Sequence, residues 1–269
     1  MSPILVGVLG LVVGSFLNVV IFRMKHGRSF VKGRSMCASC QHALGALDLI
    51  PVVSFIFLRG RCRYCKARIS FQYPLVEIAT AMVFLIIYYK YQDLIGLWNI
   101  KRAFGLSAKT HQPLYLLPFR DGIFSALLLV IFIYDLRYYL ILDKLVLPLI
   151  VFAFAINVAL GFSPERMLVS AVAVAGFFAL QFLLSKGKWV GGGDIRLGFL
   201  IGVMLSWPGS LDALFSAYII GALVSVALLV TKRKSWKSPL PFGSFLAATA
   251  MYNLLYGEIF LDWYISLLV

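Results

Sequence analysis

The stretch VGGGDIRLGFLIG, residues 190–202, joins three successive glycines and an aspartate to a run of apolar residues. The run is hydrophobic enough to enter a membrane, where an ionised carboxylate such as that of Asp194 is costly and usually functional. Gly191 to Gly193 have no Cβ atoms, so the backbone can bend sharply here and approach another segment closely. The stretch therefore predicts a membrane helix with a carboxylate at its mouth, beside a place where an extended peptide can dock.

The rest of the chain is similarly apolar. Of its 269 residues, 61% are hydrophobic and 13% are charged, which is more apolar surface than one soluble core of this size would hide. Apolar stretches recur at about the 20 residues needed to cross about 30 Å of hydrocarbon, so we expect an all-α polytopic membrane protein. They predict about eight transmembrane helices, at about 3–22, 74–91, 122–135, 144–162, 167–185, 195–211, 213–231 and 242–260.

Two longer segments separate these spans. We expect a first transmembrane helix at 1–22, a cytoplasmic four-cysteine segment at 23–72 and a transmembrane core at 73–269. The segment at about 92–121 mixes aromatic residues with scattered charges, which favours a position along the outer interface.

The distribution of charge predicts the orientation of the chain. Most of the 25 lysines and arginines fall in 23–72 and in loops on the same side, which predicts that this side is cytoplasmic and the N-terminus periplasmic. The net charge of +14 favours this topology and attraction to anionic membrane lipids. Nucleic acid is not expected as a partner, because no basic run is interleaved with aromatic residues on a soluble module.

All four cysteines lie in the cytoplasmic segment as two CxxC pairs, Cys37 with Cys40 and Cys62 with Cys65. This spacing is typical of a zinc ribbon, in which four thiolates hold one ion and leave no open coordination position. We interpret the set as a structural zinc site; disulfides, redox chemistry and unliganded thiols stay open, although a reducing compartment disfavours disulfides. His42 is expected beside the site rather than on the ion, because four sulfurs already complete the coordination.

Three aspartates adjoin apolar spans at the predicted inner face: Asp135, Asp143 and Asp194. Other acidic residues, among them Asp121, are expected at outer span ends without a chemical role. The plainer interpretation of Asp194 is a helix cap, which contributes about 0.3–1 kcal/mol. Two carboxylates within hydrogen-bonding distance instead share a proton, so that one activates water while the other donates to a carbonyl. Because no cysteine lies outside the two pairs and no Ser/His/Asp set is visible, aspartyl protease chemistry remains.

Seven blocks of this chain resemble, in order, the bacterial type IV prepilin peptidases, which are intramembrane aspartic proteases with a GxGD motif. The blocks are GSFLNVVIFR (14–23), RSMCASC (34–40), IPVVSFIFLRGRCRYC (50–65), ISFQYPLVE (69–77), DLRYYLILD (135–143), GGGDIRLG (191–198) and LPFGSFLA (240–247). The resemblance implies that Asp135 and Asp194 are the catalytic pair and that 73–269 is the peptidase core. Gly191 and Gly193 of the motif, and Asp143 eight residues after Asp135, would support the pair.

The resemblance also implies the reaction. Such enzymes remove the short basic leader of prepilins and pseudopilins just after a glycine, at the cytoplasmic face of the bacterial inner membrane. Those with the cysteine segment typically also N-methylate the new N-terminus with S-adenosylmethionine, so a bifunctional enzyme is expected. Nothing in the composition or spacing points to methylation, which is expected from the resemblance alone.

The chain departs from the family pattern at several positions. Ala38 replaces the proline of CPxC, Gln72 the arginine of ISxRYP, and Arg196 the lysine that commonly follows the GxGD aspartate by two residues, while Ile141 and Leu142 precede Asp143 in place of LP. None of these changes removes a thiolate or a catalytic carboxylate.

Glu77 and the block 240–247 can each be interpreted in two ways. Glu77, near the cytoplasmic end of the second span, either pairs with an arginine of 59–68 or contributes to the transferase site. The block 240–247 is either a helix start led by proline with close glycine packing, or a wall of the substrate groove.

Two other classes of protein stay open. An ion-coupled transporter would use membrane aspartates and a glycine-broken helix, but its site would lie near the midplane rather than at one face. A zinc-anchored scaffold of a secretion machine would need no catalysis. Loss of the leader from a prepilin incubated with the solubilised protein distinguishes the protease from both.

Overall fold

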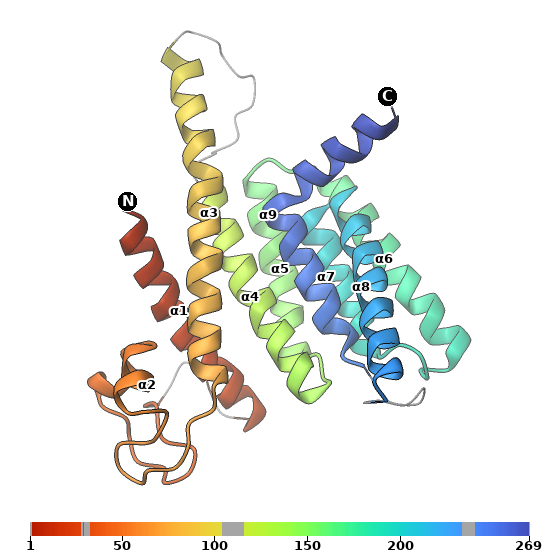
Figure 1. Cartoon of the computed structure of the whole chain (residues 1–269). Helices are drawn as coiled ribbons and strands as arrows, with labels where there is room; N and C mark the ends of the chain where they lie inside the picture. Colours follow the sequence, from red (N-terminus) through yellow and green to blue (C-terminus); the bar gives the residue numbers. More distant parts are fainter. Residues whose placement is uncertain (1, 28, 30–32, 104–115, 233–239, 269) are drawn as a thin grey trace. The chain divides into compact units, whose positions relative to one another are not determined.

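The computed structural model describes residues 2–27, 29, 33–103, 116–232 and 240–268, with the backbone alone for 93–103 and 258–268. The described regular structure is helical, except that residues 33–71 are mostly turns and loop with two short helices and two isolated β-bridges. The chain divides into two compact units, Met1–Leu97 and Trp98–Val269, and each is described by itself (Figure 1).

Unit 1 contains two long helices, α1 (Pro3–Lys25) and α3 (Gln72–Ala103), that pack backbone against backbone. A Cβ atom on Gly10 would lie 2.5 Å from the Ala81 Cα, and one on Gly14 would lie 2.7 Å from the Glu77 Cα. Small residues four positions apart are the usual means by which membrane helices approach this closely. The segment between the two helices in sequence carries the short helices η1 (Ala46–Leu49) and α2 (Val53–Phe57).

Unit 2 is a bundle in which α7 is central. Its helices are α4 (Leu117–Tyr138), α5 (Asp143–Ala159), α6 (Pro164–Ser185), α7 (Gly192–Leu205), α8 (Gly209–Val230) and α9 (Phe242–Leu268). α7 contacts α5, α6, α8 and α9, and its Leu197, Leu200 and Ile201 are fully buried. A Cβ on Gly202 would lie 2.3 Å from the Ala171 Cα, so α6 and α7 approach each other closely at this glycine.

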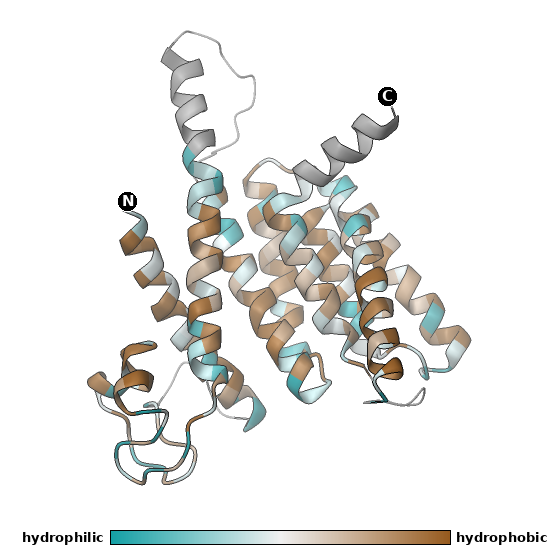
Figure 2. Cartoon of the chain, in the orientation of Figure 1, coloured by the Kyte–Doolittle hydropathy of each residue, from teal (hydrophilic) through white to brown (hydrophobic). Residues whose placement is uncertain are grey.

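Among the residues that the structure describes, five helices are long and apolar enough to cross a membrane: α1, α3 over Gln72–Gln92, α4, α6 and α8. Hydrophobic residues run along the helices of both units in Figure 2. The other predicted spans correspond to α5 with 17 residues, to α7 with 14, and to α9, whose side chains are described only to Gly257. The polytopic, all-α prediction is confirmed to this extent, and the count of eight spans stays a prediction.

The predicted interfacial segment at about 92–121 falls largely outside the description, because residues 104–115 are among those not described. Its described ends are helical, with α3 continuing to Ala103 and α4 beginning at Leu117. Its position along the outer interface stays a prediction.

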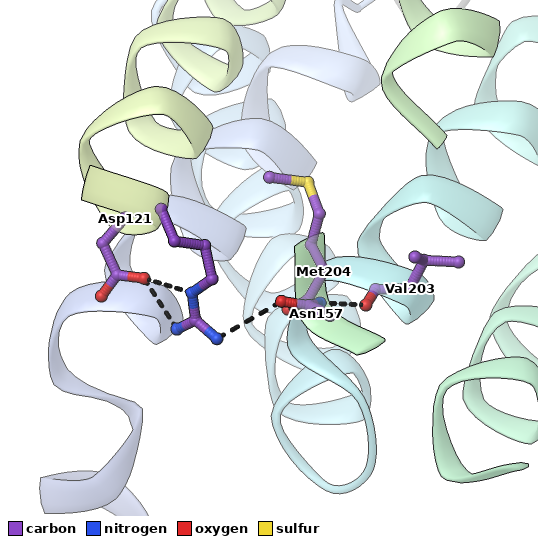
Figure 3. Close-up of polar contacts among 5 residues, drawn as sticks. Asp121, Asn157, Val203 and Met204 are labelled. Atoms are coloured by element: carbon purple, nitrogen blue, oxygen red, sulfur yellow. Dashed lines mark hydrogen bonds and ion pairs between the residues drawn. The ribbon is translucent and has the colours of Figure 1, made fainter. Parts of the chain in front are cut away.

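α7 ends early, and its last carbonyls find partners on a neighbouring helix (Figure 3). Its 14 residues span about 21 Å, less than the ~30 Å hydrocarbon layer, so its C-terminal carbonyls need donors from the protein. The buried Asn157 amide of α5 donates to the carbonyls of Val203 at 2.9 Å and Met204 at 3.4 Å. Arg120 donates in turn to the Asn157 Oδ1 and pairs with the fully buried Asp121 at 2.7 Å.

Candidate active site and metal centre

Asp135 lies in the last turn of α4 with 5% of its surface exposed. Ser244, on α9, donates to its Oδ2 twice, from the backbone N–H at 2.6 Å and from the hydroxyl at 3.0 Å. Ser244 is in the first turn of its helix, where backbone N–H groups have no partner within the helix. The start of α9 is therefore built to hold the Asp135 carboxylate.

Asp194 lies in the first turn of α7 with 9% of its surface exposed. Its Oδ2 accepts the Gly191 N–H at 3.0 Å, and its own N–H donates to the Gly191 carbonyl at 3.1 Å. Asp194 therefore does cap the start of α7, as the plainer interpretation of the sequence predicts. Only one of its two carboxylate oxygens is used in this cap.

Ile141, in the loop between α4 and α5, lies between the two helix starts. A Cβ on Gly193 would lie 2.9 Å from the Ile141 Cβ. A Cβ on Gly243 would lie 2.9 Å from the Ile141 Cδ1 and 3.1 Å from the Asp135 Oδ2. The two glycines thus let the starts of α7 and α9 close around one side chain, at the end of unit 2 that holds both aspartates. The two carboxylates are close enough to interact electrostatically.

Asp143 has a different partner. It begins α5 and pairs with Arg196 of α7, and both side chains are about half exposed. Arg196 thus supplies a cation that joins α5 to α7.

Sequence reasoning missed two side chains here. Ser244 lies in the block 240–247 and could have been chosen as a donor, because that block starts a helix. Tyr218 of α8 lies within electrostatic reach of Asp194, donates to Gln181 at 3.0 Å and packs its ring 4.8 Å from that of Phe242. Its apolar span carries no local signal that would have identified it.

The four thiols of the segment between α1 and α3 converge. All are free, and their Sγ atoms lie within 4.8 Å of one another, so the cluster could hold a metal ion. The two CxxC pairs form the same turn: the Cys37 N–H donates to the His42 carbonyl at 3.0 Å, and the Cys62 N–H to the Ala67 carbonyl at 2.8 Å. Two matching turns that face each other are the arrangement a tetrahedral all-sulfur site needs.

The thiols differ in acidity. Burial raises the pKa of Cys37, but hydrogen bonds from the Cys40 and Ser39 backbone and from neighbouring thiols outweigh it and lower the pKa from 9.0 to about 7. A backbone hydrogen bond from Ala67 lowers the pKa of Cys65, but burial and the other three thiols outweigh it and raise the pKa to about 11. A central cation would favour the thiolate form of all four.

Polar contacts around the cluster fix its turns. The His42 ring lies 3.7 Å from that of Tyr64, so the histidine stacks beside the sulfurs. Asp48 accepts from Arg63 at 2.6 Å and from the Gly45 N–H at 3.1 Å. The Arg63 guanidinium holds the pKa of the Asp48 carboxyl below its usual range, even though burial opposes this.

Glu77 belongs to unit 1, where it is buried on α3. Its Oε2 accepts the Val52 N–H at 2.7 Å. No ion pair joins it to an arginine of 59–68, all of which the structure describes. Its observed contact holds the loop before α2 against α3.

Comparison with known proteins assigns the chain to a family. Residues 8–91 match the bacterial peptidase A24 N-terminal domain, and residues 122–226 match the type IV leader peptidase family. The chain belongs to the type IV leader peptidase family. The family predicted from the seven sequence blocks is confirmed.

Relatives of this leader peptidase match over most of its length. It is 31% identical over 264 residues to the "prepilin leader peptidase/N-methyltransferase" of Bacillus subtilis, covering 97% of this chain and 96% of the relative. Relatives with the same name are 31% identical over 297 residues in Aeromonas hydrophila, covering 97% and 93%, and 32% identical over 284 residues in Burkholderia pseudomallei, covering 94% and 85%. No solved structure matches the chain.

The packing around Ile141 predicts different effects for two neighbouring glycines of the leader peptidase. Gly193→Ala would crowd the Ile141 Cβ and is expected to destabilise unit 2 by about 1–3 kcal/mol. Gly192→Ala is the matched control, because a Cβ there meets nothing within 4 Å. Thermal unfolding in detergent should show a lower midpoint for the first variant and an unchanged or higher one for the second. Equal midpoints would contradict the close approach at Gly193.

Proposed function

We propose that this leader peptidase is a membrane aspartic endopeptidase in which Asp135 and Asp194 are the catalytic pair. It removes the short basic leader of prepilins and pseudopilins after a glycine, and it N-methylates the new N-terminus. The observation that carries the catalytic proposal is the convergence of the starts of α7 and α9, which draws both buried carboxylates to one end of unit 2. Gly191, Gly193 and Asp143 support the pair by capping, close packing and the Arg196 ion pair.

The chemistry follows from one proton shared by two carboxylates. The ionised member takes a proton from a water molecule as its oxygen attacks the scissile carbonyl, and the neutral member donates its proton to the carbonyl oxygen. The tetrahedral intermediate then collapses: the C–N bond breaks, the departing amine receives the proton taken from water, and the hydroxyl formed from the carbonyl returns its proton to the other carboxylate as C=O re-forms. Ser244 orients Asp135 and the Gly191 N–H orients Asp194, so the pair is positioned before substrate arrives.

We place the catalytic end at the cytoplasmic face of the bacterial inner membrane. Basic residues in membrane loops stay cytoplasmic, and the sequence near this end of unit 2 carries Arg137, Lys144, Lys186, Lys188 and Arg196. In unit 1, α1 ends with Arg23 and Lys25, which favours a periplasmic N-terminus. A basic leader would then remain on the cytoplasmic side while the apolar stem of the prepilin lies among the helices, with membrane lipids as neighbours and no role for nucleic acid.

The four cysteines are proposed to hold one structural zinc ion. A tetrahedron with Zn–S bonds of about 2.3 Å places its sulfurs about 3.8 Å apart. The Cys37 and Cys65 sulfurs lie 3.9 Å apart, which fits this geometry. Such an ion would cross-link the two CxxC turns and would take no part in hydrolysis. The methyl donor implied by the family is S-adenosylmethionine, and methylation is supported by the family alone; Glu77 stays a candidate for that half of the activity.

Removing either catalytic charge tests the dyad. Asp135→Asn and Asp194→Asn should each reduce leader removal by at least about a hundredfold, because one remaining carboxyl cannot accept the proton of water and donate a proton to the carbonyl at the same time. The assay incubates solubilised full-length protein with a prepilin and follows loss of the leader. Asp143→Asn is the comparison and should retain far more activity, since its carboxylate pairs with Arg196. Substantial cleavage by Asp194→Asn, with the fold intact, would refute the assignment.

Metal content tests the zinc site separately. Elemental analysis of purified protein should find about one zinc per chain, and Cys62→Ser should lose most of it because a four-sulfur site is closed. His42→Ala is the control and should keep its zinc, because the ring stacks on Tyr64. Reduced thiols with well under one metal per chain would contradict the proposal.

A further inference from the structure

The four-cysteine segment carries three arginines that neither the metal cluster nor the aspartates explain. Arg59, Arg61 and Arg68 are exposed and line a hollow of about 340 Å³ together with Phe55, Ile69 and Phe71. The hollow is therefore lined by both basic and apolar side chains.

Two of these arginines face each other. Arg61 and Arg68 are paired in an isolated antiparallel bridge, which brings their side chains close together. Like charges in such a pair repel, and within the described ranges neither is joined to a carboxylate. The nearby Asp48 is already paired with Arg63. An anion held between the two guanidinium groups would turn this repulsion into attraction.

The hollow lies next to a membrane span of the same unit. Ile69 and Phe71 come just before α3, whose first residue, Gln72, also begins the candidate span Gln72–Gln92. On α2, Ile56 and Phe57 expose 66% and 83% of their surface although they belong to a segment outside the spans. Exposed apolar side chains beside basic ones are typical of protein segments that lie in the headgroup layer.

We propose that Arg59, Arg61 and Arg68 bind the phosphate of an anionic phospholipid headgroup, with α2 and Phe71 against the adjoining apolar part of the lipid. Guanidinium groups bind phosphate through paired N–H donors, so two facing arginines suit one phosphate. The charge of the hollow disfavours the other available ligands, because a basic leader and the sulfonium of S-adenosylmethionine are cationic. The site anchors the four-cysteine segment to the membrane surface and does not depend on the proposed catalytic pair.

Lipid binding by the full-length protein tests this site. Native mass spectrometry in detergent, with phosphatidylglycerol and phosphatidylethanolamine at equal concentration, should show phosphatidylglycerol adducts on the parent protein. Arg61→Gln/Arg68→Gln should weaken phosphatidylglycerol binding by about 25-fold, the effect of two surface arginines at about a factor of five each. The matched control Lys186→Gln/Lys188→Gln removes the same charge from two exposed lysines of unit 2 and should leave binding unchanged.

If the double variant is unstable, a variant that reverses one charge, Arg68→Glu, tests the same site. Arg68→Glu should pair with Arg61 and keep the segment folded, as judged by retained metal content and melting temperature, while phosphatidylglycerol binding is lost. Equal loss in the arginine and lysine variants would show general charge attraction and overturn the site. Displacement of the lipid by S-adenosylmethionine would assign the hollow to the methyl donor and overturn it as well.

Discussion

The hydrogen bonds from Ser244 to Asp135 join the last turn of α4 to the first turn of α9, across 109 residues of sequence. A buried carboxylate is tolerated only where donors replace the water it has lost, and the unpaired N–H groups of a helix start provide them. The same contact requires a close approach at Gly243, whose missing side chain leaves room for both Asp135 and Ile141. Apolar packing brings α9 against α4, α7 and α8, and this junction fixes the Asp135 carboxylate at the start of α9.

The two ends of α7 show how the apolar bundle accommodates polar groups. At its beginning, Asp194 caps the helix with one oxygen and leaves the other available. At its end, Asn157 satisfies two carbonyls of a helix too short to cross the hydrocarbon layer, and the Arg120–Asp121 pair adjoins that amide. The polar groups at the end are fully engaged with one another, whereas those at the beginning retain capacity for a substrate. This difference favours the beginning of α7 as the reactive end.

Local patterns predicted what depends on residue type and spacing: the family, the convergence of the four cysteines and, among the described residues, five of the eight proposed membrane helices. The helix predicted at 195–211 instead ends at Leu205, because Ser206 has a positive φ of 56° that a helix does not allow, and Pro208 follows. Contacts between distant helices could not be predicted, since a serine in an apolar block carries no sign of its partner. Burial is a second limit: the sequence places Asp121 at an outer span end without a role, but Asp121 is fully buried and pairs with Arg120, which donates to Asn157 of α5.

The central claim is that two carboxylates share one proton during catalysis, and the pH dependence of kcat/KM for leader removal tests it most directly. Only the singly protonated pair can both activate water and donate to the carbonyl, so the rate should fall on the acid side, where both carboxyls are protonated, and on the alkaline side, where both are ionised. The account predicts a bell-shaped profile that belongs to the pair. A rate that rises with pH to a lasting plateau would indicate one general base or a metal-bound hydroxide, and it would contradict the dyad.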